Sequence, residues 1–305
     1  MPAWIVTGGS GFLGRHLLDR LGPVAPGGAE VVAVGRRPPR GWAGRFVAAD
    51  FDDRDAVARA VDRVRPEVMF HLAGRTPPGT ADEFERANVG ATVAWLDALR
   101  AAGRAVRFVL AGSAAELGPI PLDALPVGED WPCDPADAYG LTKLCATVAA
   151  VSSRGTVQTV VARIFNPIGP GLPTAQALGR FARALAEGDG DLTLTVGDLD
   201  ARRDFVDARD VADALIALAG RGRPGRLYHV GTGRSRRVGD GLDRLIALSG
   251  RRVVVQIDPG FARPAGPSDS RADIARIVAE VGWVPRIAWE QSLLDLWEAA
   301  RAGPG

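Results

Sequence analysis

The chain of 305 residues is long enough for a large hydrophobic core, and its 47% apolar and 24% charged residues are ordinary for a globular protein. A net charge of +1 argues against bulk nucleic-acid binding and against a polybasic membrane anchor. Two cysteines and three scattered histidines argue against a disulfide framework and a metal site. We expect a cytoplasmic protein without a signal peptide or a membrane span.

The first 165 residues alternate short apolar strands with helices. The expected strands cover residues 4–7, 30–35, 45–48, 68–72, 106–111 and 157–164, and the expected helices cover 11–21, 53–64, 81–102 and 135–153. Because these strands are apolar and rich in β-branched residues, both faces of their sheet should be buried. The alternation predicts an α/β fold with a Rossmann-type, doubly wound parallel sheet.

The pattern changes after Pro167, where a turn-rich segment and shorter elements follow. We therefore predict a dinucleotide-binding Rossmann domain at residues 1–165 and a smaller α/β substrate-binding lobe, mainly at residues 166–305. Segments near residues 204–230 are expected to return to the first domain.

A glycine-rich segment runs from Thr7 to Gly14, after the first expected strand and into the first expected helix. Gly8, Gly11 and Gly14 have the spacing Gly-x-x-Gly-x-x-Gly. Glycines permit a tight turn and let backbone N–H groups approach a pyrophosphate at the N-terminus of a helix. The position between a strand and a helix predicts dinucleotide binding, the alternative being a tight turn that binds nothing.

Arg36 and Arg37 follow the second expected strand. An NAD-specific site usually places an acid there for the ribose 2′-hydroxyl, whereas arginine suits a 2′-phosphate. NADP(H) is therefore favoured, and NAD(H) stays open because arginine carries most of the positive charge of this chain. Further cofactor contacts are expected after the third and fourth strands, at Asp50, Phe51, Leu72, Ala73 and Gly74.

Lys143 is the single lysine among 37 basic residues, and it lies four residues after Tyr139, one of two tyrosines. This spacing places both side chains on one face of a helix. An ammonium group beside a phenol favours the phenolate, so the tyrosine can exchange a proton nearer neutral pH. The pair predicts proton transfer to or from a carbonyl or an alcohol; the alternative is a surface tyrosine and an unrelated lysine.

Motifs in a fixed order resemble the extended short-chain dehydrogenase/reductase family, in its NAD-dependent epimerase/dehydratase group. They lie at residues 7–14, 71–73, 88–92, 111–113, 139–143, 163–166, 203–207, 228–233 and 282–285. The resemblance implies that Tyr139 is the catalytic acid/base and that Lys143 holds the nicotinamide ribose and lowers the pKa of the tyrosine. Ser113 would hydrogen-bond the reacting carbonyl oxygen together with Tyr139.

The resemblance also implies binding roles. The implied cofactor contacts are Gly8, Gly11, Phe12, Leu13, Gly14, Arg36, Asp50, Phe51, Leu72, Ala73, Gly74, Ala111, Tyr139, Lys143 and Ile164. The implied substrate contacts are Ser113, Asn166, Arg203 and Arg263, with the last three facing the nucleotide part of the substrate. A homodimer through the helices at 81–102 and 135–153 is expected, in which Leu96, Leu99, Leu144 and Val148 serve either the interface or the core.

The loop after Ser113 discriminates between reactions of the family. Sugar 4,6-dehydratases carry an Asp-Glu pair there, whereas this chain has Ala114 and Ala115, which argues against elimination chemistry. Leu117 replaces a usual tyrosine and leaves the sugar open, and Glu116 is interpreted as a loop anchor rather than a catalyst.

The C-terminal pattern looks most like nucleotide-sugar 4-ketoreductases such as GDP-4-keto-6-deoxymannose reductases. It consists of residues 257–259, 263–264, 282–285 and 289–293. We expect NAD(P)H-dependent reduction of the 4-keto group of a nucleotide-activated 6-deoxyhexose. The alternatives are a nucleotide-sugar 4-epimerase with bound NAD, a reductase of a non-sugar carbonyl, and a cofactor-binding regulator without catalysis.

Overall fold

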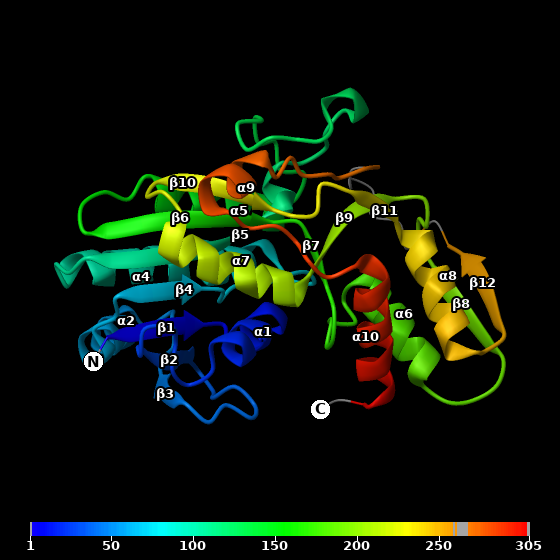
Figure 1. The fold of residues 1–305 in the computed structure, drawn as a ribbon, viewed down its shortest axis with the longest axis horizontal. Coiled ribbons are helices and arrows are strands. Elements are labelled where there is room, and N and C mark those ends of the chain that lie inside the picture. Colours follow the sequence, from blue (N-terminus) through cyan, green and yellow to red (C-terminus); the bar gives the residue numbers. More distant parts are fainter. Residues whose placement is uncertain (1, 259, 261–267, 304–305) are drawn as a thin grey trace.

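The computed structural model describes residues 2–258, 260 and 268–303. Within them, a parallel sheet of seven strands has the order β10-β6-β5-β4-β1-β2-β3 (Figure 1). Its strands are β1 (Ala3–Thr7), β2 (Glu30–Gly35), β3 (Arg45–Ala48), β4 (Val68–His71), β5 (Val106–Ser113), β6 (Val157–Ile164) and β10 (Arg226–Val230). The chain winds outward from β1 in both directions, which confirms the predicted Rossmann-type doubly wound fold.

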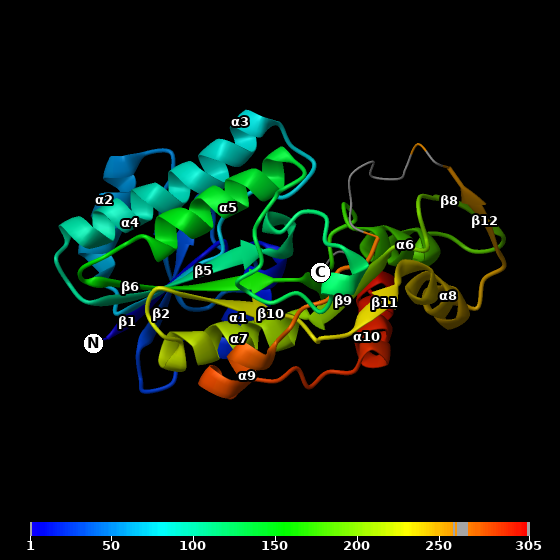
Figure 2. The ribbon, with the colours of Figure 1, turned by 90° about the horizontal axis from the view of Figure 1, so that it is seen from above.

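Helices cover both faces of this sheet (Figure 2). On one face lie α2 (Arg54–Val64), α4 (Ala91–Ala101) and α5 (Ala138–Val151), and on the other lie α1 (Phe12–Leu21), α7 (Ala208–Arg221) and α9 (Ala275–Val281). Successive residues of β1 enter different cores: Ile5 packs toward α2 and α4, and Val6 packs toward α1 and α7. This alternation explains why the strands are apolar at nearly every position.

The helices expected at 11–21 and 53–64 each begin one residue later in the structure, and the other two expected helices differ more. The expected helix at 81–102 is divided into α3 (Ala81–Phe84), a π-helical turn (Glu85–Gly90) and α4. The expected helix at 135–153 begins only at Ala138, because the side chain of Asp137 accepts a hydrogen bond of 2.7 Å from the Gly140 N–H and caps the first turn. β4 ends one residue earlier than expected, and β5 continues to Ser113.

A smaller group of elements lies beside the sheet (Figure 1). Here α6 (Ala177–Ala186), α8 (Val238–Ser249) and α10 (Trp289–Arg301) pack around a common core, next to the parallel pair β8 (Leu192–Val196) and β12 (Val253–Ile257). Between this group and the large sheet lies a small sheet, β11-β9-β7, formed by Ser235–Arg237, Arg202–Asp207 and Asn166–Ile168.

The segment expected to return to the first domain includes β10, which pairs with β6 in the large sheet. The division of the chain at residue 165 stays a prediction. Among the described helices, none is long and apolar enough to cross a membrane.

Candidate active site

The glycine loop between β1 and α1 is held by backbone contacts that exclude side chains. Gly8 has a φ of 71°, and a Cβ there would lie 2.6 Å from the backbone nitrogen of Ala73. A Cβ on Gly14 would overlap with the carbonyl oxygen of Gly8, which accepts a hydrogen bond of 2.9 Å from the Gly11 N–H. The loop therefore folds tightly enough to direct backbone N–H groups toward a bound phosphate.

The N-terminus of α1 differs from those of the neighbouring helices. α2, α5 and α7 are capped by the preceding residues Asp53, Asp137 and Asp207, whose carboxylates accept hydrogen bonds from backbone N–H groups of the first turn. Gly11 takes this position in α1 and has no side chain to offer. The first N–H groups of α1 carry partial positive charge and are left for an anion, so the pyrophosphate of a dinucleotide fits here.

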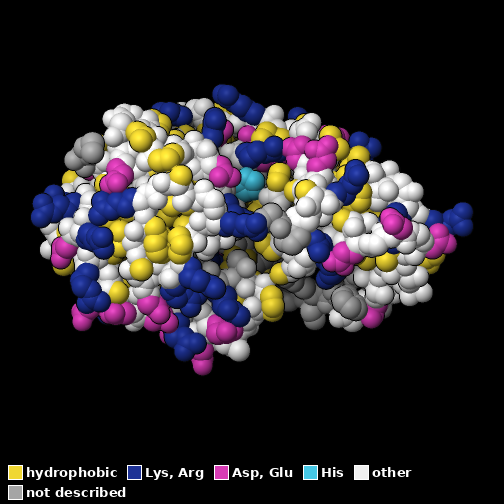
Figure 3. All heavy atoms as spheres, turned by 90° about the horizontal axis from the view of Figure 1, so that it is seen from below, with side chains coloured by type: hydrophobic (Ala, Val, Ile, Leu, Met, Phe, Trp, Pro, Cys, Tyr) yellow, Lys and Arg dark blue, Asp and Glu magenta, His cyan; other side chains and the backbone are white. Residues whose placement is uncertain are grey.

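A cleft of about 440 Å³ lies beside this loop, at the carboxyl ends of β1 to β4. It is lined by several predicted cofactor residues: Gly8, Gly11, Arg36, Asp50, Phe51, Leu72, Ala73 and Gly74. Arg37, Arg75 and Arg86 add positive charge to its walls. Figure 3 shows Lys and Arg side chains gathered beside a hollow near the middle of the molecule, which suits a ligand with phosphate groups.

Other predicted cofactor residues lie outside the lining of this cleft. The side chains of Phe12 and Leu13 are half-buried and pack against hydrophobic cores. Ala111 and Ile164 are buried at the carboxyl ends of β5 and β6. Arg75 and Arg86 are lining residues that the sequence analysis missed; the position of Arg75 directly after Gly74 was the available signal.

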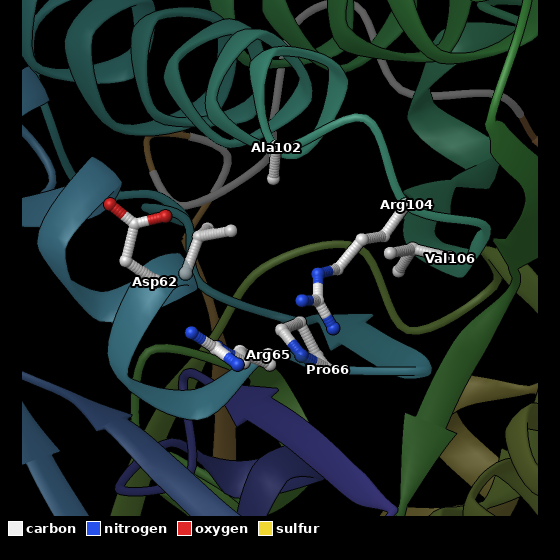
Figure 4. A pocket seen from close by; sticks show the side chains of 7 residues that line it. Asp62, Arg65, Pro66, Ala102, Arg104 and Val106 are labelled. Carbon is white, nitrogen blue, oxygen red and sulfur yellow. The ribbon is translucent and has the colours of Figure 1, made fainter.

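A second hollow lies at the opposite edge of the sheet, near the amino ends of β4 and β5 (Figure 4). It has a volume of about 200 Å³, and the guanidinium groups of Arg65 and Arg104 face the same space. None of the predicted site residues lines it. The candidate site is therefore the cleft at the carboxyl edge, where ligands bind in doubly wound sheets.

The three predicted catalytic residues lie on two neighbouring elements. Ser113 ends β5, Tyr139 lies in the first turn of α5, and Lys143 lies one turn later. The Lys143 ammonium is buried and donates a hydrogen bond of 2.6 Å to the carbonyl oxygen of Ala111. A Cβ on Gly140 would overlap with the carbonyl oxygen of Ala115, so α5 approaches the turn after Ser113 closely. This contact brings the end of β5, with Ser113, close to the first turn of α5, with Tyr139.

Asn88, in the π-helical turn, connects the cleft to the helix that carries Tyr139 and Lys143. Its Oδ1 accepts a hydrogen bond of 2.8 Å from the Arg75 N–H, and its Nδ2 donates at 3.1 Å to the hydroxyl of Thr142. Thr142 in turn donates to the carbonyl oxygen of Tyr139 at 3.0 Å. The sequence analysis noted Asn88 within a motif but assigned it no role. π-Helical turns often mark functional sites, although no sequence pattern located this one.

Two of the predicted substrate contacts lie on adjacent strands of the small sheet. Asn166 is in β7 and donates from Nδ2 to the carbonyl oxygen of Asp204 at 3.3 Å, and Arg203 is in β9. β7 and β9 pair in parallel, with Asn166 opposite Phe205. Arg263 lies outside the described residues. Among the described residues, no group of three or more His, Cys, Asp or Glu side chains could hold a metal ion.

His71 in β4 and His229 in β10 are buried, and their burial predicts that the protein loses stability in acid. Burial, together with the nearby charge of Lys143 for His71 and of Arg163 for His229, lowers the pKa of each imidazole to about 3. The unfolded chain, with histidine pKa values of about 6.5, binds more protons between these limits. Each histidine should therefore remove about 1.4 kcal/mol of stability per pH unit as the pH falls below about 6.

Urea unfolding between pH 7.5 and pH 4.5 measures this dependence. His71→Phe is the matched variant, because the ring lies between those of Phe51 and Phe108 and a phenyl group suits that space. The difference in slope between wild type and variant isolates the contribution of His71 from those of the carboxylates. Parallel slopes would contradict the assignment of a neutral, buried imidazole.

The comparison with known families agrees with this geometry. A model of the NAD-dependent epimerase/dehydratase family matches residues 4–231. The chain belongs to this family. The family resemblance that the motifs predicted is thereby confirmed, and the family comprises NAD(P)-dependent enzymes that modify nucleotide sugars.

Individual relatives match over nearly the whole chain. dTDP-6-deoxy-L-talose 4-dehydrogenase (NAD(P)(+)) of Kitasatospora kifunensis is 33% identical, covering 98% of this chain and 96% of its own. GDP-6-deoxy-D-mannose reductase of Pseudomonas aeruginosa is 30% identical, covering 96% of each. UDP-glucose 4-epimerases are also among the relatives, for example that of Mycolicibacterium smegmatis at 29% identity over 97% of this chain and 98% of its own.

Solved structures with bound cofactors are similar as well. RMD from Pseudomonas aeruginosa, in complex with NADPH, has a TM-score of 0.83 and 26% identity, and 99% of each chain is covered. MoeE5, in complex with UDP-glucose and NAD, has a TM-score of 0.86 and 28% identity over 98% of this chain and 99% of its own. Both forms of the cofactor thus occur among proteins that share this fold.

Proposed function

We propose that this protein reduces the 4-keto group of a nucleotide-activated 6-deoxyhexose with NAD(P)H. The observation that carries the proposal is the meeting of Ser113 with α5, which bears Tyr139 and a buried Lys143, beside a turn that holds Ala114 and Ala115. An alcohol, a phenol and an ammonium group suit proton transfer to a carbonyl oxygen. Two alanines offer no acid or base for elimination, which speaks against a 4,6-dehydratase.

Each catalytic side chain has a distinct part in this mechanism. Bound NAD(P)H supplies the hydride for carbon 4. Tyr139 gives its phenolic proton to the oxygen on which negative charge develops, and Ser113 stabilises that oxygen by a hydrogen bond. One of the three N–H groups of the Lys143 ammonium donates to the Ala111 carbonyl oxygen, and the other two can bind ribose hydroxyls and so orient the cofactor. The positive charge of Lys143 also favours ionisation of Tyr139.

Asn166 and Arg203 support a nucleotide diphosphate as the second part of the substrate. They lie on neighbouring strands between the large sheet and the smaller group of helices. An arginine fork matches phosphate oxygens, and an amide bonds phosphate or base edges. The relatives that act on dTDP- and GDP-linked deoxysugars are consistent with such a ligand.

The exposed Arg36 and Arg37 at the end of β2 favour NADP(H) over NAD(H). Arg36→Asp is expected to shift the ratio of kcat/KM for NADPH to that for NADH by about 10–100-fold toward NADH, because a charge-assisted bond to the 2′-phosphate is lost. Arg40→Asp is the matched control, since it changes the same charge nearby outside the cleft lining. An unchanged ratio in Arg36→Asp would rule out a 2′-phosphate contact at this position.

NADPH oxidation at 340 nm with a panel of GDP-, dTDP- and UDP-linked 4-keto-6-deoxysugars tests the proposal. Oxidation with one of these sugars is the expected result and names the substrate. If NADPH is oxidised with none of the sugars in the panel, the proposal is overturned.

A 4-epimerase with bound NAD is the second candidate, favoured by the UDP-glucose 4-epimerases among the relatives. Such an enzyme would convert UDP-galactose without net consumption of cofactor and would leave the keto sugars unchanged.

We further propose a homodimer through α5. Leu141 and Val148 are both 51% exposed on this helix. Of the other residues expected at the interface or in the core, Leu144 is half-buried, whereas Leu96 and Leu99 are buried in the core and are excluded from the interface. Val148→Asp should convert a dimer into a monomer in light scattering, since it places a charge in an apolar contact. A wild-type mass of one chain would contradict the dimer directly.

A further inference from the structure

A buried ion pair behind Ser113 takes no part in the mechanism above. Glu116 lies in the short 3₁₀ turn after β5, and Arg163 lies in β6. Their side chains are only 0% and 3% exposed, and the closest nitrogen–oxygen distance is 3.0 Å. Apolar residues of similar volume are often at least as stable as such a pair. The ion pair lies next to the proposed catalytic Ser113, so we expect a role other than stability.

The Glu116 carboxylate bonds to both elements that carry the catalytic residues. Its Oε1 accepts a hydrogen bond of 2.7 Å from the backbone N–H of Ser113 and one of 3.0 Å from the hydroxyl of Thr147. Thr147 lies on α5 one turn after Lys143, and therefore on the same face of the helix. One oxygen atom thus joins the end of β5 to the helix of Tyr139 and Lys143.

Arg163 fixes the other half of the carboxylate. Its Nε donates to Oε2 of Glu116 at 3.0 Å, and its remaining nitrogens contact the His229 ring and the Cys133 sulfur at 3.4 and 3.2 Å. The guanidinium is therefore held from three directions. With both oxygens of Glu116 bound, the carboxylate cannot rotate away from the Ser113 N–H.

Charge supports the same arrangement. Burial raises the pKa of Glu116, and the positive charges of Arg163 and Lys143 oppose this rise. Burial lowers the pKa of Lys143, and the charge of Glu116 opposes that fall. Glu116 is thus a counter-charge for the buried ammonium as well as a hydrogen-bond acceptor for Ser113.

We propose that Glu116 is a positioning residue that fixes Ser113 relative to α5. Loss of the acceptor oxygen of Glu116 should therefore lower the rate of catalysis without changing the affinity for the cofactor. Reactive groups tolerate little displacement, since a shift of about 1 Å can cost about 100-fold in rate. The proposal rests on the proposed function for its kinetic consequence, but the tether itself is independent of the substrate.

Two double variants separate the tether from the ion pair. E116Q/R163M retains an acceptor oxygen for Ser113 and Thr147, whereas E116M/R163M has none; both lose the charges and the contacts of Arg163. Replacing the whole pair avoids a buried, unpaired arginine, which would threaten folding. We expect kcat of E116M/R163M to be at least about 10-fold below that of E116Q/R163M, with the same Kd for NADPH. Equal kcat values would overturn the proposal.

Thr147→Val supplies a test that leaves the ion pair in place. It removes only the bond between Glu116 and α5, and the loss of one hydrogen bond should lower kcat by about 3–10-fold without changing the Kd for NADPH. A wild-type kcat in this variant would also count against the tether.

Amide hydrogen exchange tests the position of Ser113 without any substrate. A peptide covering residues 110–118 should exchange faster in E116M/R163M than in E116Q/R163M, because the Ser113 N–H loses its acceptor. If wild type reduces no sugar of the panel, the proposed function fails, and exchange still decides on the tether. If wild type is active and the two double variants exchange at the same rate, the tether is contradicted and the proposed function stands.

Discussion

Tyr139→Phe is expected to lower kcat by about 10²–10⁴-fold with little change in the Kd for NADPH. The Tyr139 ring lies edge-on against Phe84, with ring centroids 5.8 Å apart, and a phenyl group preserves this packing. The substitution therefore removes the hydroxyl and preserves the ring packing, so the loss of kcat measures what the hydroxyl contributes to catalysis. Steady-state NADPH oxidation gives kcat, and quenching of NADPH fluorescence gives the Kd.

Tyr228→Phe is a matched control, because the chain has two tyrosines and the second lies in the edge strand β10, outside the cleft lining. The Tyr228 hydroxyl donates to Glu280 at 2.7 Å and accepts from the Arg223 N–H at 3.0 Å. Its removal should cost about 1 kcal/mol of stability and leave kcat unchanged. If Tyr139→Phe retained more than a tenth of wild-type kcat, or if both variants lost activity equally, Tyr139 would not be the proton donor.

The first half of the fold could be predicted because its signals are local. Most strands of the large sheet are buried on both faces, so an apolar run identifies them without knowledge of their partners. β10, in which Arg226 and His229 interrupt the apolar run, was not among the expected strands. The glycine loop and the spacing of Tyr139 and Lys143 are equally local. Their places at the carboxyl edge followed from the order of strands and helices, since parallel strands end at one edge.

The division of the expected helix at 81–102 could not be predicted, because its cause is tertiary. Asn88 bonds to the backbone of Arg75 and to Thr142 in α5, and the π-helical turn accommodates these contacts. All residues of this segment are compatible with an α-helix. By contrast, the start of α5 at Ala138 could have been read from Asp137, which is a favoured capping residue.

The smaller group of elements depends on pairings between distant residues. β8 pairs with β12, and the strands of the small sheet have as few as three residues, including Pro167 in β7. Such short segments carry no periodicity of their own. The sequence predicted a loop anchor at Glu116 but not its partners, because Thr147 and Arg163 lie 31 and 47 residues away.

Gly14→Ala is expected to weaken NADPH binding by at least about 30-fold, which corresponds to about 2 kcal/mol. A Cβ at this position would overlap with the carbonyl oxygen of Gly8, so the loop must open and withdraw its N–H groups from the pyrophosphate. Calorimetric titration gives the Kd, and the rise in melting temperature on adding NADPH, which reports binding to the folded state, should become smaller than in wild type.

Gly220→Ala and Gly11→Ala separate this effect from a general loss of stability. Gly220 lies in α7 with open space around it, so alanine should leave NADPH binding unchanged and stabilise the helix slightly. A Cβ on Gly11 has 3.2 Å to its nearest neighbour, the Gly8 oxygen, and it enters the cleft lining, so this variant should fold normally and still bind NADPH more weakly. Wild-type affinity in both loop variants would mean that the cofactor phosphates bind elsewhere than at the uncapped N-terminus of α1.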